Sequence, residues 1–210
     1  MSDQTIDDPV IYVVDDNLDV REGLKALLES VGLKSETFGS AAEFVKRSRR
    51  DQVSCLILDV RLPGLSGLDF QTELAQAQVD TPIIFITGHG DISMTVRAMK
   101  AGAIEFLTKP VREQDLLDAV RAALDRDRAR RAQITKTADI RARYAALTPR
   151  EQLVMKLVCT GLMNKQTAAE MGVSEITVKV HRHNLMKKLG AKTLPDLVRM
   201  ADMLGITGKQ

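Results

Sequence analysis

The sequence has few of the features that mark exported or membrane-spanning proteins. It contains two cysteines, Cys55 and Cys159, which lie far apart inside apolar runs and therefore predict reduced, buried thiols rather than a disulfide or a metal pair. No run approaches the roughly 20 apolar residues of a membrane span. The acidic N-terminal stretch lacks the basic and apolar regions of an export signal. We therefore expect a cytoplasmic protein.

Charge is unevenly distributed along the chain. Residues 1–122 contain 13 Lys and Arg against 20 Asp and Glu, which gives a net charge of −7. Residues 123–144 contain 7 basic and 3 acidic residues, a net charge of +4. Residues 145–210 contain 10 basic and 5 acidic residues, a net charge of +5. We expect the acidic part to bind a cation or take part in phosphate chemistry, and the basic part to bind a polyanion.

The first 125 residues alternate short apolar runs with segments of helical spacing. Some of the runs are apolar throughout, as expected for a parallel sheet that is covered on both faces. The pattern predicts a doubly wound α/β domain with a five-stranded parallel sheet. The predicted strands are Val10–Val14, Lys34–Phe38, Ser54–Leu58, Pro82–Ile86 and Ile104–Leu107.

A basic segment and a helical domain follow. In residues 126–144 the apolar spacing fails, so we expect a solvated helix or a hinged linker rather than a coiled coil. Residues 145–210 are helical in pattern. Thr148 to Glu151 have the sequence of a capping box, and three glycines then separate four predicted helices. The sequence thus predicts an α/β domain over 1–125, a basic linker, and a small all-α domain over 145–210.

Polar side chains follow the predicted strands at their carboxyl ends. Asp15 and Asp16 follow the first strand, Asp59 the third and Thr87 the fourth, and Lys109 comes just after the fifth. Ligands of open parallel sheets bind at this edge, and neighbouring strands are about 4.8 Å apart, so these groups should converge. Three carboxylates repel one another or require a cation, and Mg²⁺ suits such oxygen ligands. Taken singly, each residue could instead be a turn former, a helix cap or a solvated side chain.

This constellation resembles the receiver domain of two-component response regulators. The resemblance covers roughly residues 8–125 and is carried by VVDDN at 13–17, LDVRLPGLSG at 58–67, ITGHGD at 86–91 and FLTKP at 106–110. It implies that Asp59 accepts the phosphoryl group of a phosphohistidine on a sensor histidine kinase. It also implies that the domain is not a dedicated enzyme, although it supports its own Mg²⁺-dependent phosphoryl transfer and autodephosphorylation.

The resemblance implies a Mg²⁺ site. Asp16 and Asp59 would bind the ion directly together with the backbone carbonyl of Arg61, and Asp15 would act through water. Arg61 and His89 occupy positions that tune the lifetime of the acyl phosphate in receivers. Phosphatases of the haloacid dehalogenase type also use an aspartate nucleophile at a strand end, but they require a second aspartate two residues on, where this chain has Arg61.

The resemblance also implies a switch. Thr87 would bond a phosphoryl oxygen, Lys109 would form an ion pair with it, and Phe106 matches the aromatic residue of the Thr-and-aromatic switch of the family. Tyr is common at that position, and a plain core role for Phe106 stays open. The surface expected to change comprises the fourth helix over Ile92–Ala101, the fifth strand and the fifth helix, which typically dimerise in this family.

The segment Leu162–Ala191 predicts a helix-turn-helix. The first helix ends at Gly172, and Ser174 is placed to cap the second. The second helix has one apolar face, and its other face combines basic, hydrogen-bonding and small apolar groups, which suits a DNA major groove. The apolar face comprises Val178, Leu185 and Leu189.

This part resembles the LuxR/FixJ-type output domain, so the whole chain resembles a response regulator of the FixJ/NarL family, FixJ subfamily. The resemblance implies base-edge contacts by Ile176, Lys179, Val180 and His183. It also implies phosphate contacts by Lys165, Thr177, Arg182, Asn184 and Lys187. Alternatively, the basic residues form a solvated face and Val180 belongs to the core.

Together these observations predict a phosphorylation-activated transcription regulator. Phosphorylation of Asp59 is expected to favour a homodimer that binds two half-sites of double-stranded DNA, and RNA polymerase is a further expected partner. A phosphorylation-independent binding module, controlled by a protein partner, is the alternative.

Overall fold

The computed structural model describes residues 8–47, 52–88 and 90–206. Contacts between residues divide the chain into two compact units, with the division between Arg131 and Ala132. Of the helices in the described ranges, none is long and apolar enough to cross a membrane. Cys55 and Cys159 are free thiols; Cys55 is buried as predicted, whereas Cys159 is only partly buried.

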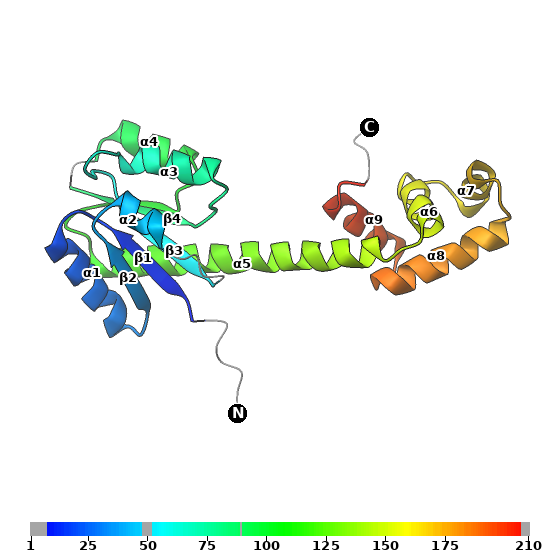
Figure 1. The fold of residues 1–210 in the computed structure, drawn as a ribbon, viewed down its shortest axis with the longest axis horizontal. Helices are drawn as coiled ribbons and strands as arrows, with labels where there is room; N and C mark the ends of the chain where they lie inside the picture. The colour runs from blue at the N-terminus through cyan, green and yellow to red at the C-terminus, as the bar shows by residue number, and fades with distance from the viewer. Residues whose placement is uncertain (1–7, 48–51, 89, 207–210) are drawn as a thin grey trace, which may run out of the picture. The chain divides into compact units, whose positions relative to one another are not determined.

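The first unit contains a five-stranded sheet in the order β2-β1-β3-β4-β5 (Figure 1). Every neighbouring pair of strands is parallel, so the predicted doubly wound sheet is confirmed. Strands β1, β3 and β4 are buried along their whole length, which explains why their sequences are apolar throughout. The strands are β1 (Val10–Val14), β2 (Lys34–Phe38), β3 (Ser54–Asp59), β4 (Ile83–Thr87) and β5 (Glu105–Thr108).

Helices follow the strands in alternation. A short polar side chain caps the amino end of each of the first four helices and accepts hydrogen bonds from their free backbone N–H groups; these caps are Asn17, Ser40, Ser66 and Asp91. The helices are α1 (Leu18–Ser30), α2 (Ala41–Lys46), α3 (Gly67–Gln76), α4 (Ile92–Lys100) and α5 (Glu113–Ala145).

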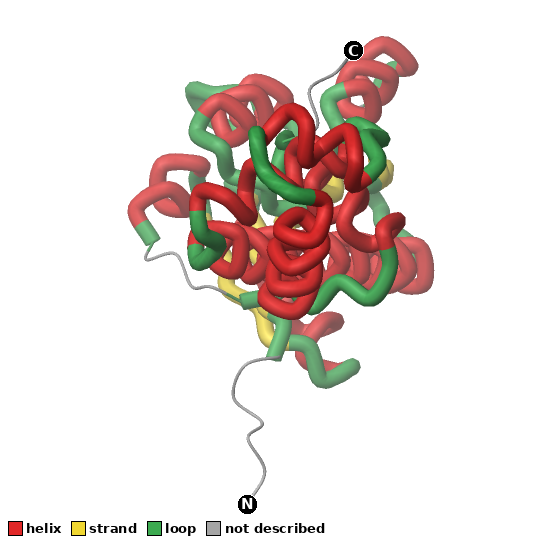
Figure 2. Tube along the Cα trace, turned by 90° about the vertical axis from the view of Figure 1, so that its right-hand side faces the viewer, coloured by secondary structure: helices red, strands yellow, loops and turns green. Residues whose placement is uncertain are grey.

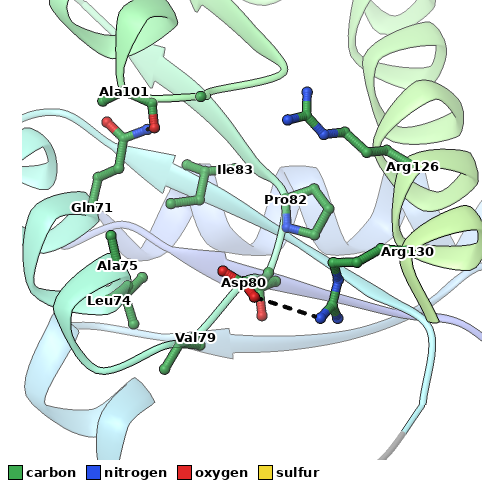
Figure 3. A pocket seen from close by; sticks show the side chains of 12 residues that line it. Gln71, Leu74, Ala75, Val79, Asp80, Pro82, Ile83, Ala101, Arg126 and Arg130 are labelled. Carbon is green, nitrogen blue, oxygen red and sulfur yellow. Dashed lines mark hydrogen bonds and ion pairs between the residues drawn. The ribbon is translucent and has the colours of Figure 1, made fainter. Parts of the chain in front are cut away.

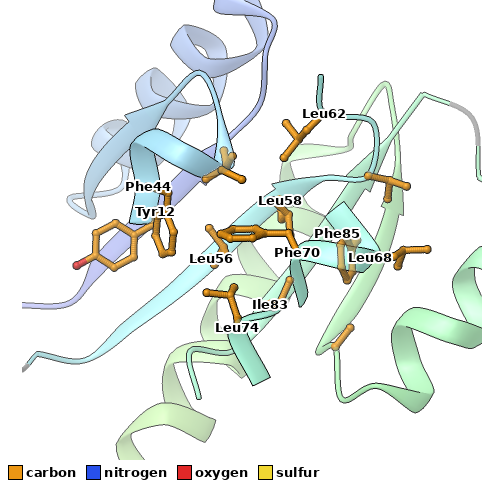
Figure 4. Packing of buried hydrophobic residues seen from close by; sticks show 14 of the residues in the cluster. Tyr12, Phe44, Leu56, Leu58, Leu62, Leu68, Phe70, Leu74, Ile83 and Phe85 are labelled. Atoms are coloured by element: carbon orange, nitrogen blue, oxygen red, sulfur yellow. The ribbon is translucent and has the colours of Figure 1, made fainter. Parts of the chain in front are cut away.

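Two apolar layers cover the two faces of the sheet. On one face, side chains of α1 and α5 pack against Ile11, Ile57 and Ile84. On the other face, α2, α3 and α4 enclose a layer that includes Tyr12, Leu58 and Phe85. Figure 4 shows this second layer, in which the rings of Tyr12, Phe44 and Phe70 lie along the sheet. The sheet is therefore rigid beneath the polar residues at its edge.

Helix α5 is a single helix of 33 residues. It includes residues 126–144, for which the sequence left a solvated helix or a hinged linker open. Most residues at the start of this segment are exposed, but Asp127 is fully buried. The predicted boundaries of the linker stay predictions, and the division between the two compact units falls inside it, after Arg131.

The described residues of the second unit are helical and include no strand; Figure 2 colours the helices red and the strands yellow. The capping box predicted for its first complete helix is confirmed, because Thr148 Oγ1 accepts from the N–H of Glu151 and the Glu151 side chain accepts from the N–H of Thr148. The predicted apolar face of Val178, Leu185 and Leu189 is fully buried. The four helices are α6 (Pro149–Cys159), α7 (Asn164–Met171), α8 (Glu175–Leu189) and α9 (Leu194–Met203).

Candidate functional site

The register of the sheet brings the polar strand ends together. Val14 pairs with Leu58 across β1 and β3, so the residues that follow them, Asp15 and Asp59, are neighbours at the carboxyl edge. Asp59 itself pairs with Ile86 of β4, and Thr87 is the next residue. The convergence expected from the sequence is therefore a direct result of strand order.

Lys109 joins the two buried carboxylates. Its Nζ lies 2.6 Å from Asp15 Oδ2 and 2.8 Å from Asp59 Oδ2. The lysine is placed by its backbone, because the N–H of Lys109 donates to the carbonyl of Thr87 at 2.7 Å. Asp15 and Asp59 are both buried, and a shared ammonium group offsets much of the repulsion between two carboxylates.

The remaining oxygens of these carboxylates meet backbone donors. Asp15 Oδ1 accepts from the N–H of Asn17 at 2.9 Å, and Asp59 Oδ1 accepts from the N–H of Arg61 at 3.1 Å. Asp16 is exposed, and its carboxylate has no hydrogen bond or ion pair within the described part of the chain. One ligand oxygen from each of Asp15, Asp16 and Asp59 can be chosen so that all three lie within 4.8 Å of one another. This all-oxygen donor set fits Mg²⁺.

Burial and charge shift the acidity of the paired groups. Burial raises the pKa of Asp15, and the hydrogen bonds from Lys109 and Asn17 only partly offset this effect. Burial by itself would lower the pKa of Lys109, but its hydrogen bonds to Asp15 and Asp59 raise the pKa above its ordinary value. Lys109 therefore stays protonated at neutral pH and is available to pair with added negative charge.

Thr87 and Phe106 lie beside the same small space. Thr87 is fully buried, whereas Phe106 of β5 is partly buried and packs 6.1 Å from the ring of Phe85. A Cβ atom built on Gly90 would lie 2.9 Å from Phe106 Cε1 and 3.2 Å from Thr87 Cγ2. The absence of a side chain at Gly90 is thus required for the present position of the ring. His89 lies outside the described residues.

A second glycine closes the loop that follows Asp59. A Cβ atom on Gly67 would lie 2.3 Å from the backbone carbonyl oxygen of Asp59, closer than any side chain allows. The N–H of Gly67 donates to the carbonyl of Val60 at 2.9 Å. The start of α3 therefore packs closely against the backbone at the end of β3.

The acidic cluster is separate from a pocket at the opposite edge of the sheet. That pocket has a volume of about 360 Å³ and lies beside the start of β4, where Pro82 and Ile83 form part of its wall. Figure 3 shows Arg126 and Arg130 of α5 on one side of it, with Arg130 Nη1 3.9 Å from Asp80 Oδ2. The carboxyl ends of the strands, where Asp59 and Thr87 lie, do not line this pocket.

The second unit contains the predicted helix-turn-helix. Helix α7 ends at Gly172, which adopts the left-handed conformation with φ of 64° and so favours glycine. Ser174 Oγ accepts from the N–H of Thr177 at 3.1 Å and caps α8. This geometry fixes α8 relative to α7 and leaves one face of α8 exposed.

The residues expected to contact DNA gather on that exposed face and at the start of α7. Ile176 is 74% exposed and Val180 is 52% exposed, so the alternative that Val180 belongs to the core is wrong. Thr177 and Arg182 are partly buried, and Arg182 Nη1 donates to Asn164 Oδ1 at 3.1 Å. The other expected contact residues are exposed: Lys165, Lys179, His183, Asn184 and Lys187.

Comparison with known families matches both units. Residues 11–121 match the family described as response regulator receiver domain, and residues 145–201 match the bacterial regulatory proteins of the luxR family. The chain belongs to the response regulators. Its two domains are a receiver and a LuxR-type DNA-binding domain, as the resemblance implied.

Individual relatives of this response regulator agree. It is 58% identical over 198 residues to nodulation protein W of Bradyrhizobium diazoefficiens, covering 94% of this chain and 87% of that protein. It is 39% identical over 194 residues to the transcriptional regulatory protein FixJ of Rhizobium meliloti, covering 92% and 95%. Among solved structures, the response regulator StyR is 50% identical with a TM-score of 0.79, covering 93% of this chain and 98% of that chain.

Three side chains of the response regulator have structural roles that were not predicted from the sequence. Arg21 donates to backbone carbonyls beside the acidic cluster, the Asn17 side chain caps α1 by accepting from the N–H of Asp19, and Asp127 is buried against the start of β3. The cap could have been found from the sequence, because an Asn directly before a helical pattern is a common N-cap. The other two depend on contacts between elements and left no local signal.

Proposed function

We propose that Asp59 of this response regulator accepts a phosphoryl group from a phosphohistidine of a sensor kinase. The observation that carries the proposal is Lys109 Nζ, which lies within 2.8 Å of both Asp15 and Asp59, beside the uncommitted carboxylate of Asp16. We propose that Mg²⁺ binds Asp16, Asp59 and the backbone carbonyl of Arg61 directly, and Asp15 through water. When bound, the ion would neutralise charge on the phosphoryl oxygens.

The reaction uses groups that are already in place. A carboxylate oxygen of Asp59 attacks phosphorus in line, the new P–O bond forms, and the P–N bond breaks with its electron pair going to the imidazole nitrogen. Lys109 exchanges its bond with Asp59 Oδ2 for one with a phosphoryl oxygen. Thr87, one residue beyond the partner of Asp59 in β4, donates its hydroxyl to another phosphoryl oxygen.

Phosphorylation would be transmitted through Thr87 and Phe106. Movement of the Thr87 hydroxyl toward the phosphoryl group vacates space, and the ring of Phe106 moves into it. We propose that this change favours a homodimer through α4, β5 and α5. An apolar stripe at spacings of four and three residues on α4 supports this surface: Ile92, Val96 and Met99 are all exposed.

The dimer would bind two half-sites of double-stranded DNA about one helical turn apart. We propose base-edge contacts by Ile176, Lys179, Val180 and His183, and phosphate contacts by Lys165, Thr177, Arg182, Asn184 and Lys187. RNA polymerase is a further proposed partner, and the cytoplasm is the expected location of a regulator that binds promoter DNA.

Phosphorylation is tested by mass spectrometry of the intact chain after incubation with acetyl phosphate and Mg²⁺. The expected result is an added mass of about 80 Da, one phosphoryl unit, in the wild type. Asp59→Asn abolishes the addition. The control Asp69→Asn, an exposed aspartate in the first turn of α3, keeps it. An unmodified wild-type chain, or an equally modified Asp59→Asn chain, would contradict the assignment.

Regulation is tested by DNA binding with and without the phosphoryl mimic beryllofluoride. We expect beryllofluoride and Mg²⁺ to increase operator affinity and the dimer fraction of the wild type, with no effect on Asp59→Asn. Equal DNA binding by all forms would instead support the alternative of a module controlled by a protein partner.

A further inference from the structure

Arg21 reaches from α1 back to the loop that carries two of the three clustered carboxylates. Its Nη1 donates to the carbonyl of Asp15 at 2.7 Å and to the carbonyl of Asp16 at 3.0 Å. We propose that Arg21 is a positioning residue for cation binding, because it fixes the backbone from which both carboxylates project. This inference rests on the proposed Mg²⁺ site.

The loop of Asp15 and Asp16, which Arg21 contacts, is also held by hydrogen bonds at its two ends. The N–H of Asp15 donates to the carbonyl of Phe38, the last residue of β2, at 3.2 Å, and the N–H of Asn17 donates to Asp15 Oδ1 at 2.9 Å. Asp16 lies between these two points and its side chain is exposed. The bond from Arg21 to the Asp16 carbonyl is therefore a main restraint on the direction of the Asp16 carboxylate.

The loop after β2 lies beside Arg21. A Cβ atom on Gly39 would lie 3.6 Å from Arg21 Nη1 and 3.6 Å from Glu43 Oε2, and the N–H of Gly39 donates to Glu43 Oε2 at 2.8 Å. Glu43 thus holds the backbone of Gly39 beside the guanidinium group. The loops after β1 and β2 meet at Arg21, which restricts its rotamers.

The chemistry of the guanidinium group determines how Arg21 can affect cation binding. It has donors only and stays protonated, so Arg21 cannot bind a cation. It acts by orienting the backbone from which Asp15 and Asp16 project. Loss of a group that orients metal ligands typically lowers metal affinity by about 10–100-fold.

The experiment compares Mg²⁺ binding by four full-length chains: wild type, Arg21→Met, Arg21→Lys and Lys25→Met. Lys25 is the matched control, because it lies one turn further along α1, is exposed and forms an ion pair with Glu29, at 3.8 Å. Isothermal titration calorimetry gives the dissociation constant, and circular dichroism verifies folding. We expect Arg21→Met to raise the dissociation constant about tenfold, Arg21→Lys to have an intermediate effect, and Lys25→Met to stay within about twofold of wild type.

A second measurement distinguishes a role of Arg21 in positioning the Mg²⁺ ligands from a general effect on the structure. The rate of phosphorylation by acetyl phosphate is measured against Mg²⁺ concentration. For Arg21→Met the half-saturating concentration should rise about tenfold while the rate at saturation changes much less, because a positioning residue touches neither phosphorus nor Asp59. If Arg21→Met does not fold, Arg21→Lys must show the raised half-saturating Mg²⁺ concentration with little change in the rate at saturation.

The outcomes distinguish this inference from the proposed function. A wild-type chain that binds no Mg²⁺ would overturn both. Wild-type affinity in Arg21→Met, or an equal loss in Arg21→Met and Lys25→Met, would overturn the inference alone. A fall in the saturating rate with unchanged half-saturation would also overturn it.

Discussion

The carboxylate of Asp127 in α5 accepts a hydrogen bond from the backbone N–H of Ser54, the first residue of β3, at 3.0 Å. Arg130 and Arg131 donate to the same carboxylate at 2.7–3.0 Å. Asp59, the proposed phosphoacceptor, is the last residue of this strand. One strand therefore has the acidic cluster at its carboxyl end and an attachment to α5 at its amino end.

The first prediction concerns the stability of this attachment. Asp127→Ala leaves the Ser54 N–H and two arginines without their buried acceptor, and should lower the free energy of unfolding by about 2–4 kcal/mol, since breaking a buried ion pair is strongly destabilising and the arginines are partly exposed. Urea denaturation of the full chain measures the change. Asp125→Ala, which breaks the exposed pair with Arg128, should cost less than about 1 kcal/mol. Equal effects of the two substitutions would refute the attachment.

The second prediction concerns Lys109. Lys109→Met removes the cation shared by Asp15 and Asp59, so Mg²⁺ should bind more tightly while phosphorylation by acetyl phosphate slows about 100-fold, because a donor to the phosphoryl oxygens is lost. Calorimetry and intact-mass kinetics measure the two effects. Lys100→Met, at an exposed site on α4, serves as control. Phosphorylation at the wild-type rate in Lys109→Met would contradict the proposed role.

The third prediction concerns pH and the second unit. Burial alone would raise the pKa of Glu151, but hydrogen bonds from Lys188 and Thr148 outweigh it and hold the pKa below its ordinary value of 4.5. A depressed carboxyl pKa adds stability above the unfolded-state value, and this stability is lost as the pH falls through the folded-state pKa.

The second unit should therefore become less stable on acidification below about pH 4.5. Amide signals of α6 and α8 in NMR spectra of the full chain would report urea midpoints at neutral and acidic pH. Glu151→Gln should flatten this dependence, whereas Glu170→Gln, at an exposed site on α7, should keep it. An unchanged slope in Glu151→Gln would show that another group is responsible.

The fourth prediction concerns DNA. Lys179 is exposed and its Nζ lies 3.0 Å from Glu175 Oε1, one turn earlier on α8. Lys179→Ala should weaken operator binding by about 1–3 kcal/mol and relax preference at the contacted bases. Binding isotherms on operator and scrambled DNA measure both effects. Lys156→Ala, an exposed lysine on α6, should leave the operator preference intact, and the same result for Lys179→Ala would remove it from the base-contacting set.

Local patterns were sufficient for the fold. The five predicted strands agree with β1 to β5 within one residue at either end, because apolar runs bounded by turn residues are a property of short segments. The acidic cluster was also predictable, since a parallel sheet places Asp15, Asp59 and Thr87 at one edge whatever the details of packing. The capping box at Thr148 and the buried face of α8 followed from spacing alone.

The contacts of two charged side chains, Asp127 and Arg21, were not predictable from the sequence. Asp127 lies in a run of arginines and aspartates that reads as solvated, and only the approach of α5 to the start of β3 makes it buried. Arg21 is one of several charged residues on α1, and nothing in its neighbours indicates that it turns back to the loop before the helix. The role of Asp127 requires knowing where β3 lies, and that of Arg21 requires knowing the direction of its side chain toward carbonyls five and six residues earlier.

Gly90 has a consequence for how activation could evolve. A methyl group on this residue would contact both Thr87 and Phe106, so the ring movement that we propose for Phe106 would depend on a position with no reactive group of its own. A single added carbon there would narrow the range of ring orientations while leaving every phosphate-handling atom unchanged. If the proposed switch operates, mutations at Gly90 would change the strength of the signal without changing the groups proposed to handle phosphate.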